Sequence, residues 1–182
     1  MKHLLIFVFF LAATFQVTAQ KYITKTGAIQ FYSEGAIEKI EAINKQVNAA
    51  LDIKSGDMVF KVVIKSFEFE KALMQEHFNE NYLESDKFPN ASFVGKVINI
   101  DKMDFSKDGK YEADITGKIT IHGVTKDIST KGSLESKNGK ITGHSVFNIL
   151  VKDFKIEIPG AVVKNIAESI EITVNIALDK LK

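Results

Sequence analysis

Most of the chain beyond residue 20 alternates between apolar and polar residues, the pattern of strands that bury one face. The alternation is cleanest from Tyr111 to Ile121, where every second residue is apolar or glycine and the intervening residues are Glu, Asp, Thr and Lys. The pattern predicts eight strands, at residues 22–31, 43–53, 58–69, 93–100, 111–121, 127–136, 141–151 and 168–178. Residues 36–44 fit either a helical turn or an irregular strand.

One segment, from Glu70 to about Glu84, breaks this pattern and predicts a short helix. Its apolar and aromatic residues recur at steps of three and four, which gives one apolar helix face: Leu73, Met74, His77, Phe78 and Tyr82. Pro89 prevents a return to helix because its ring excludes helical geometry in the residue before it. A lone helix in a β chain is expected to cap the open end of a sheet or barrel.

Short turn signals join the predicted strands. Lys54–Asp57, Lys107–Lys110 and Lys137–Lys140 each contain a glycine, and the last contains the Asn-Gly pair favoured in two-residue hairpins. Short strands joined by such turns predict an antiparallel sandwich or a closed barrel. A barrel of about eight strands can hold one small ligand, although periodicity does not distinguish an occupied barrel from one filled by its own side chains.

The first 19 residues have the pattern of a secretory signal peptide. Met1–His3 is basic, Leu4–Phe15 is almost entirely apolar, and Val17–Ala19 supplies the small residues at a cleavage site. The apolar run is shorter than the roughly 20 residues of a membrane-spanning helix. We therefore expect a signal peptide at 1–19, one domain at 20–182, export to the periplasm or the extracellular space, and no membrane-spanning segment.

Composition narrows the classes of partner. The formal net charge is +1, and removal of the predicted signal peptide with Lys2 leaves it near zero, so no nucleic-acid partner is expected. The chain has no arginine, which excludes bidentate arginine clamps on phosphates or carboxylates. It also has no cysteine, so neither a lipid-anchored lipoprotein nor disulfide stabilisation is expected.

Three motifs resemble the YceI family of exported bacterial lipocalin-like proteins. They are the strand end and turn Lys118–Lys126 (KITIHGVTK), the strand entry Lys87–Phe93 (KFPNASF), and the helix and loop Leu73–Asp86, which is similar to the branch common in Bacteroidetes. The resemblance implies an all-β, eight-stranded antiparallel lipocalin-like barrel with one short helix covering it. It also implies an apolar pocket for a long amphiphilic chain, with polyisoprenoids the best-known class, and it carries over no catalytic residue.

Residues that could support catalysis or metal binding show no characteristic spacing. His77, His122 and His144 lack the spacings of zinc sites, and no Gly-x-Ser-x-Gly motif indicates a serine hydrolase. His122 precedes a turn glycine, where we expect it to hydrogen-bond to backbone. We therefore expect no enzyme, no metal and no cofactor.

The favoured hypothesis is a carrier that sequesters a lipid-like ligand, an isoprenoid or a fatty chain, in the barrel. The predicted apolar pocket residues are Phe60, Phe67, Met74, Phe78, Phe93, Ile119, Ile121, Phe147, Ile172 and Val174, and the predicted polar groups at the mouth are His77, Asn81 and Tyr82. The alternative is a structural or interaction module with a self-filled barrel. The oligomeric state, a homodimer included, stays open.

Overall fold

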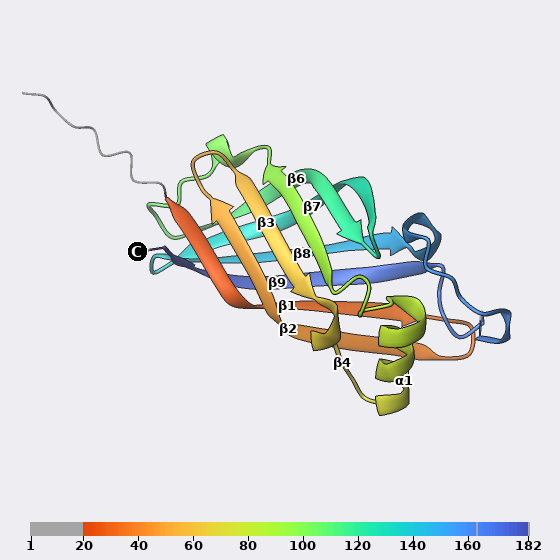
Figure 1. Cartoon of the computed structure of the whole chain (residues 1–182). Helices are drawn as coiled ribbons and strands as arrows, with labels where there is room; N and C mark the ends of the chain where they lie inside the picture. The colour runs from red at the N-terminus through yellow and green to blue at the C-terminus, as the bar shows by residue number, and fades with distance from the viewer. Residues whose placement is uncertain (1–19, 163, 182) are drawn as a thin grey trace, which may run out of the picture.

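The chain folds into a closed antiparallel barrel (Figure 1). The computed structural model describes residues 20–162 and 164–181, and the predicted signal peptide at 1–19 lies outside the described residues. The long strands are β1 (Lys21–Glu34), β2 (Lys39–Asp52), β3 (Asp57–Val63), β5 (Asn90–Val97), β6 (Gly109–Ile121), β7 (Val124–Lys137), β8 (Lys140–Leu150) and β9 (Ser169–Lys180). They pair in the order β1-β9-β8-β7-β6-β5-β3-β2, and β2 pairs again with β1, so eight long strands close the barrel as predicted. The two-residue β4 (Glu68–Phe69) adds a short pairing to β2.

The predicted helix is present but shorter. It comprises α1 (Ala72–His77) and a π-helical turn, η2 (Phe78–Tyr82), which together lie beside β4 at one side of the barrel (Figure 1). The segment cannot start at Glu70 because Lys71 has extended geometry, and it ends before Glu84, whose φ of 41° is left-handed. Four 3₁₀ turns complete the described elements: η1 (Ile64–Ser66), η3 (Ile100–Lys102), η4 (Val151–Phe154) and η5 (Gly160–Val162).

The prediction of one continuous strand over 58–69 is wrong. Strand β3 ends at Val63, and the turn η1 follows. Ile64 and Phe67 are both buried, although a continuous strand would place positions three apart on opposite faces. The turn returns Phe67 to the inside of the barrel, and it is anchored by the Ile64 N–H, which donates to the Pro89 carbonyl at 3.0 Å. Residues 39–44, ambiguous from the sequence, belong to strand β2.

The interior has two halves. In the filled half, the inward side chains of the strands pack into one core with Ile100 of η3: Tyr22, Ala49, Leu51, Met58, Val97, Ile100, Ala113, Leu134, Ile141, Ile176 and Leu178. This half lies at the end of the barrel where β1 begins and β9 ends (left in Figure 1). In the other, hollow half, the same strands enclose a cavity.

Candidate ligand-binding site

The cavity in the hollow half has a volume of about 250 Å³ and is lined by 32 residues. Among the described residues, no charged side chain lines it. The polar lining residues are Ser33, Tyr82, Ser92, Thr130 and Ser145. Two of these hydroxyls already have backbone partners, since Ser145 Oγ donates to the Lys131 carbonyl at 2.7 Å and Ser33 Oγ accepts from the Ala167 N–H at 2.9 Å. The wall therefore offers mainly hydrocarbon contacts.

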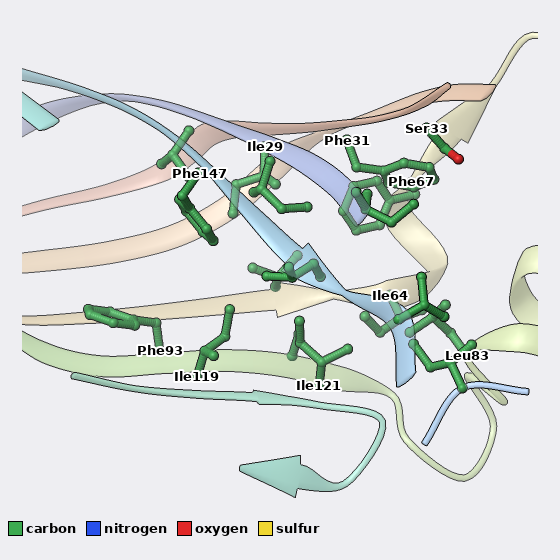
Figure 2. Close-up of a pocket in the computed structure, with 18 of the residues that line it drawn as sticks. Ile29, Phe31, Ser33, Ile64, Phe67, Leu83, Phe93, Ile119, Ile121 and Phe147 are labelled. Atoms are coloured by element: carbon green, nitrogen blue, oxygen red, sulfur yellow. The ribbon is translucent and has the colours of Figure 1, made fainter. Parts of the chain in front are cut away.

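Strand alternation builds most of this wall. Along β9, the inward positions are Ile170, Ile172 and Val174, followed by Ile176 and Leu178 of the filled half. The first three line the cavity because successive side chains of a strand point to opposite faces, so every second residue points inward. Figure 2 shows the same arrangement from neighbouring strands, with side chains of β1 and β8 directed toward those of β5 and β6.

The helical segment closes one side of the cavity through an aromatic cluster. Phe78 stacks on Phe31 of β1 with ring centroids 5.4 Å apart, and its centroid lies 5.6 Å from Phe67 and 5.0 Å from Phe69. Such ring pairs contribute about 0.5–1.5 kcal/mol each beyond their buried area. The cluster fixes the helix against the barrel, so Met74, Phe78 and Tyr82 face the cavity.

All ten predicted apolar pocket residues line this cavity. Of the three predicted mouth residues, Tyr82 lines it, whereas His77 and Asn81 are exposed and do not. His77 and Asn81 are four residues apart and share the outer helix face, while Phe78 and Tyr82 share the inner one. Direct contact of any of these residues with a ligand stays a prediction.

Several lining residues were not predicted. Those on strands include Ile29, Phe31, Ile128, Ile149 and Ile170, and those in the segment between β8 and β9 include Ile156, Ile158 and Ile166. Alternation could have identified the strand residues, since each has the inward parity of its strand. The segment before β9 lies outside a regular strand, so its contribution required the tertiary structure.

A first polar cluster, the Glu38 cluster, fixes the start of the helical segment. The Glu38 carboxylate, in the β1–β2 turn, accepts hydrogen bonds from Lys71 Nζ at 2.8 Å and from Asn165 Nδ2 at 3.4 Å. The hydrogen bond from Lys71, together with its charge, lowers the pKa of the Glu38 carboxyl below its ordinary 4.5. Three segments around the cavity thus meet at one carboxylate.

A second polar cluster, the His122 cluster, fixes the end of the helical segment. His122 Nδ1 hydrogen-bonds to the Phe154 carbonyl at 3.1 Å, as expected for a backbone partner, and Nε2 lies 2.6 Å from Glu84 Oε2. The imidazole is only 10% exposed, and its ring meets Phe88 edge to face at 4.5 Å. The hydrogen bond from His122 is the main cause that lowers the pKa of the Glu84 carboxyl, and the charge of Lys87 acts in the same direction.

Within residues 20–162 and 164–181, no group of three or more His, Cys, Asp or Glu side chains is placed to hold a metal ion. Every helix within the described residues is too short or too polar to span a bilayer.

Comparison with known proteins finds curated relatives that match part of the chain. Curated relatives include UPF0312 proteins of Pseudomonas putida (strain W619), 31% identical over 87 residues, and of Pseudomonas syringae pv. tomato, 32% identical over 91 residues. These matches cover 44% and 45% of this chain and 42% of each relative, so the chain spans less than half the length of the curated relatives it matches.

Solved structures show the same fold over most of the chain. A polyisoprenoid binding domain from Saccharophagus degradans, implicated in plant cell wall breakdown, superposes with a TM-score of 0.77 at 11% identity, covering 90% of this chain and 99% of that one. BcnA from Burkholderia cenocepacia superposes with a TM-score of 0.68 at 15% identity, covering 84% and 95%. The family model described as the YceI-like domain matches residues 12–178. The closed barrel with one helix and the match across nearly the whole sequence lead to one assignment: the chain belongs to the YceI-like domain family.

Proposed function

We propose that the protein is an exported carrier that sequesters a long-chain amphiphile, such as a polyisoprenoid, in the hollow half of its barrel. The observation that carries the proposal is the cavity wall, which combines some 250 Å³ of space with an apolar lining free of charged side chains among the described residues. Empty apolar space of this size leaves wall atoms without packing partners, a cost that a hydrocarbon tail would remove.

The energetics favour a tail rather than a polar metabolite. Each square ångström of apolar surface removed from water contributes about 25 cal/mol, whereas a buried polar group without a hydrogen-bond partner costs about 1–3 kcal/mol. The wall has few free polar groups to meet a polar ligand, because the Ser33 and Ser145 hydroxyls already have backbone partners. A headgroup would therefore remain near the cavity opening, in contact with water.

Two further observations support the proposal. The first is the solved structure of a polyisoprenoid binding domain, which has the same fold, although its 11% identity transfers no ligand to this chain by itself. The second is the N-terminal pattern typical of a signal peptide, which supports a role in the periplasm or outside the cell. A carrier needs neither a cofactor nor a catalytic group.

The alternative is a structural or interaction module whose barrel is filled by its own side chains. The filled half fits that description, since Ile141 and Leu178 have 0% and 1% exposure. The hollow half argues against it, because its inward side chains leave the cavity between them.

The test is to identify what the protein carries. The purified protein, isolated from the periplasmic fraction of the native cells, would be extracted with organic solvent and the extract analysed by mass spectrometry. We expect a long-chain species in stoichiometric amount. Replacing Ile119 with Asp should abolish retention, because it places a charge in the apolar wall; replacing its outward-facing neighbour Thr120 with Asp is the matched control. Equal lipid content in folded protein of both variants would contradict the proposal.

A further inference from the structure

The boundary between the filled and hollow halves contains an aromatic ring seated on two glycines. Gly95 of β5 and Gly117 of β6 lie directly opposite each other on the inner face. A methyl group built on Gly117 would lie 2.5 Å from Gly95 Cα and 2.7 Å from Phe93 Cζ, and one built on Gly95 would overlap the same phenyl ring. The ring of Phe93 therefore covers a strip of wall where no other side chain fits.

Phe93 is braced from the neighbouring strand. It pairs with Phe60 of β3 across the sheet, and the two rings meet edge to face with centroids 6.2 Å apart. Both phenylalanines line the cavity, and both also pack against the core of the filled half. Met58, Ile115 and Val174 have the same double contact. These five residues, which we call the floor residues, separate the cavity from the core.

The floor is built from large side chains lying over small ones on adjacent strands. The Phe93 ring covers Gly95 and Gly117. In the same way, the Ile115 side chain covers Gly132 of β7, since its Cδ1 would lie 3.3 Å from a methyl group built on that glycine. Below the floor the core is close-packed, with Val97 at 0% exposure, so a flexible tail finds no space beyond it.

We infer that the floor residues limit how deep a hydrocarbon tail can enter, and that Phe93 is the specificity-determining residue for tail length. The inference rests on the proposed carrier function and adds to it the feature that selects among tails. Each methylene that enters an apolar cavity should lower the dissociation constant about four-fold. Once the tail end reaches Phe93, further methylenes stay outside in water, and affinity should stop rising with tail length.

Removing the ring should deepen the cavity in one direction. Successive inward positions on a strand are about 7 Å apart, and the next inward positions beyond Phe93 and Ile119 are Gly95 and Gly117, which carry no side chain. Phe93→Ala would therefore expose a bare strip of backbone that a longer tail can follow. Phe147, by contrast, lines the cavity but does not pack against the core of the filled half.

The experiment measures affinity against tail length by isothermal titration calorimetry. The purified protein, stripped of lipid on a hydrophobic resin, would be titrated with straight-chain fatty acids from octanoate to stearate. In the wild-type protein we expect the dissociation constant to fall with each added methylene and then to become constant beyond a certain tail length, which we call the limiting length. In Phe93→Ala the limiting length should be greater, and each additional methylene that enters should lower the dissociation constant about four-fold. The control Phe147→Ala should weaken the binding of fatty acids of every length, while the limiting length stays that of the wild-type protein.

The outcomes separate this inference from the proposed function. If no tail binds the wild-type protein at any length, the carrier proposal fails. If fatty acids bind and the limiting length is the same in the wild-type protein and in Phe93→Ala, the carrier proposal stands and the floor inference is overturned. Circular dichroism would verify the barrel in each variant. If Phe93→Ala does not fold, Phe93→Leu is the second variant, because it keeps an apolar side chain over the glycines. It should increase the limiting length by a smaller step. A limiting length equal to that of the wild-type protein in this folded variant would equally overturn the inference.

Discussion

The two halves of the barrel use the same strands and the same alternation, yet one is solid and the other hollow. On β9, Leu178 is buried in a complete core, whereas Ile172, six residues earlier on the same face, is only partly buried and borders empty space. The difference lies in what faces each residue. The filled half is completed by Ile100 of η3 and by Met103 and Phe105, which follow it, whereas the hollow half is covered by a helix that closes its side without filling its interior.

This comparison shows that an inward apolar position has two possible roles. In the filled half it contributes packing energy at all times. In the hollow half it borders empty space, and we expect it to contribute fully only when the proposed ligand completes its contacts. The helix cover is attached mainly through the rings around Phe78 and through the Glu38 and His122 clusters. The hollow half is therefore expected to be the less stable part of the unliganded molecule.

The largest expected effect is a direct test of this difference. Leu178→Ala should lower the free energy of unfolding by about 3–5 kcal/mol, because it creates a cavity in close-packed core. Ile172→Ala should lower it by only about 1 kcal/mol, since the removed atoms border space that is already empty. Urea denaturation of both variants measures the two values. Equal losses would mean that the two halves do not differ in packing.

A bound ligand should reduce the contrast between the halves. At a free ligand concentration about one hundred times the dissociation constant, stability should rise by about 2.7 kcal/mol. Amide hydrogen exchange with and without a long fatty acid locates the effect. We expect added protection in α1, η2 and the cavity end of β9, with little change around Ile141 and Val97. Uniform protection of both halves would argue that the ligand binds elsewhere.

The smallest expected effect concerns the attachment of the helix end at low pH. The lowered pKa of Glu84 means that its carboxylate stabilises the folded state above the ordinary value of 4.5, and that this contribution disappears as the pH falls through the lowered pKa. Glu84→Gln should therefore unfold at a lower temperature than the wild-type protein at pH 7, and the gap should close in acid.

The control for this prediction is Asp86→Asn, two residues further along the chain. Asp86 is highly exposed and pairs with Lys65 at the surface, so its replacement should change the unfolding temperature little at any pH. A gap between Glu84→Gln and the wild-type protein that stays constant down to pH 3 would contradict a role for the Glu84 charge.

Much of the fold follows from local pattern. Alternation and turn chemistry predicted the eight long strands, and the helix was expected within two residues of its observed start. The errors occur where tertiary contacts override the local pattern. The strand expected over 58–69 is interrupted by the turn η1. Ile64 and Phe67 are three positions apart and both buried, so the alternation of inward and outward residues shifts between them, and the local sequence does not indicate this shift.

The candidate site was predictable in its apolar part and less so in its polar part. Ten apolar residues were expected at a pocket and all line the cavity, because inward parity is encoded in each strand. His77 and Asn81 were expected at the mouth but lie on the outer helix face, since the orientation of a short helix depends on which of its aromatic residues contact the barrel. The boundary at Phe93 could not be predicted, because it requires knowing that Gly95 and Gly117 face each other.

The pairing of β1 with β9 determines when the cavity comes into existence. This pairing joins Tyr22 to Lys180, near opposite ends of the sequence, and Ile172 and Val174 of the cavity wall belong to the last strand. Contacts of such long sequence separation form late in folding. For the proposed exported carrier, a chain still being synthesised or exported would therefore lack the binding site, and we expect ligand uptake only in the compartment where the last strand docks.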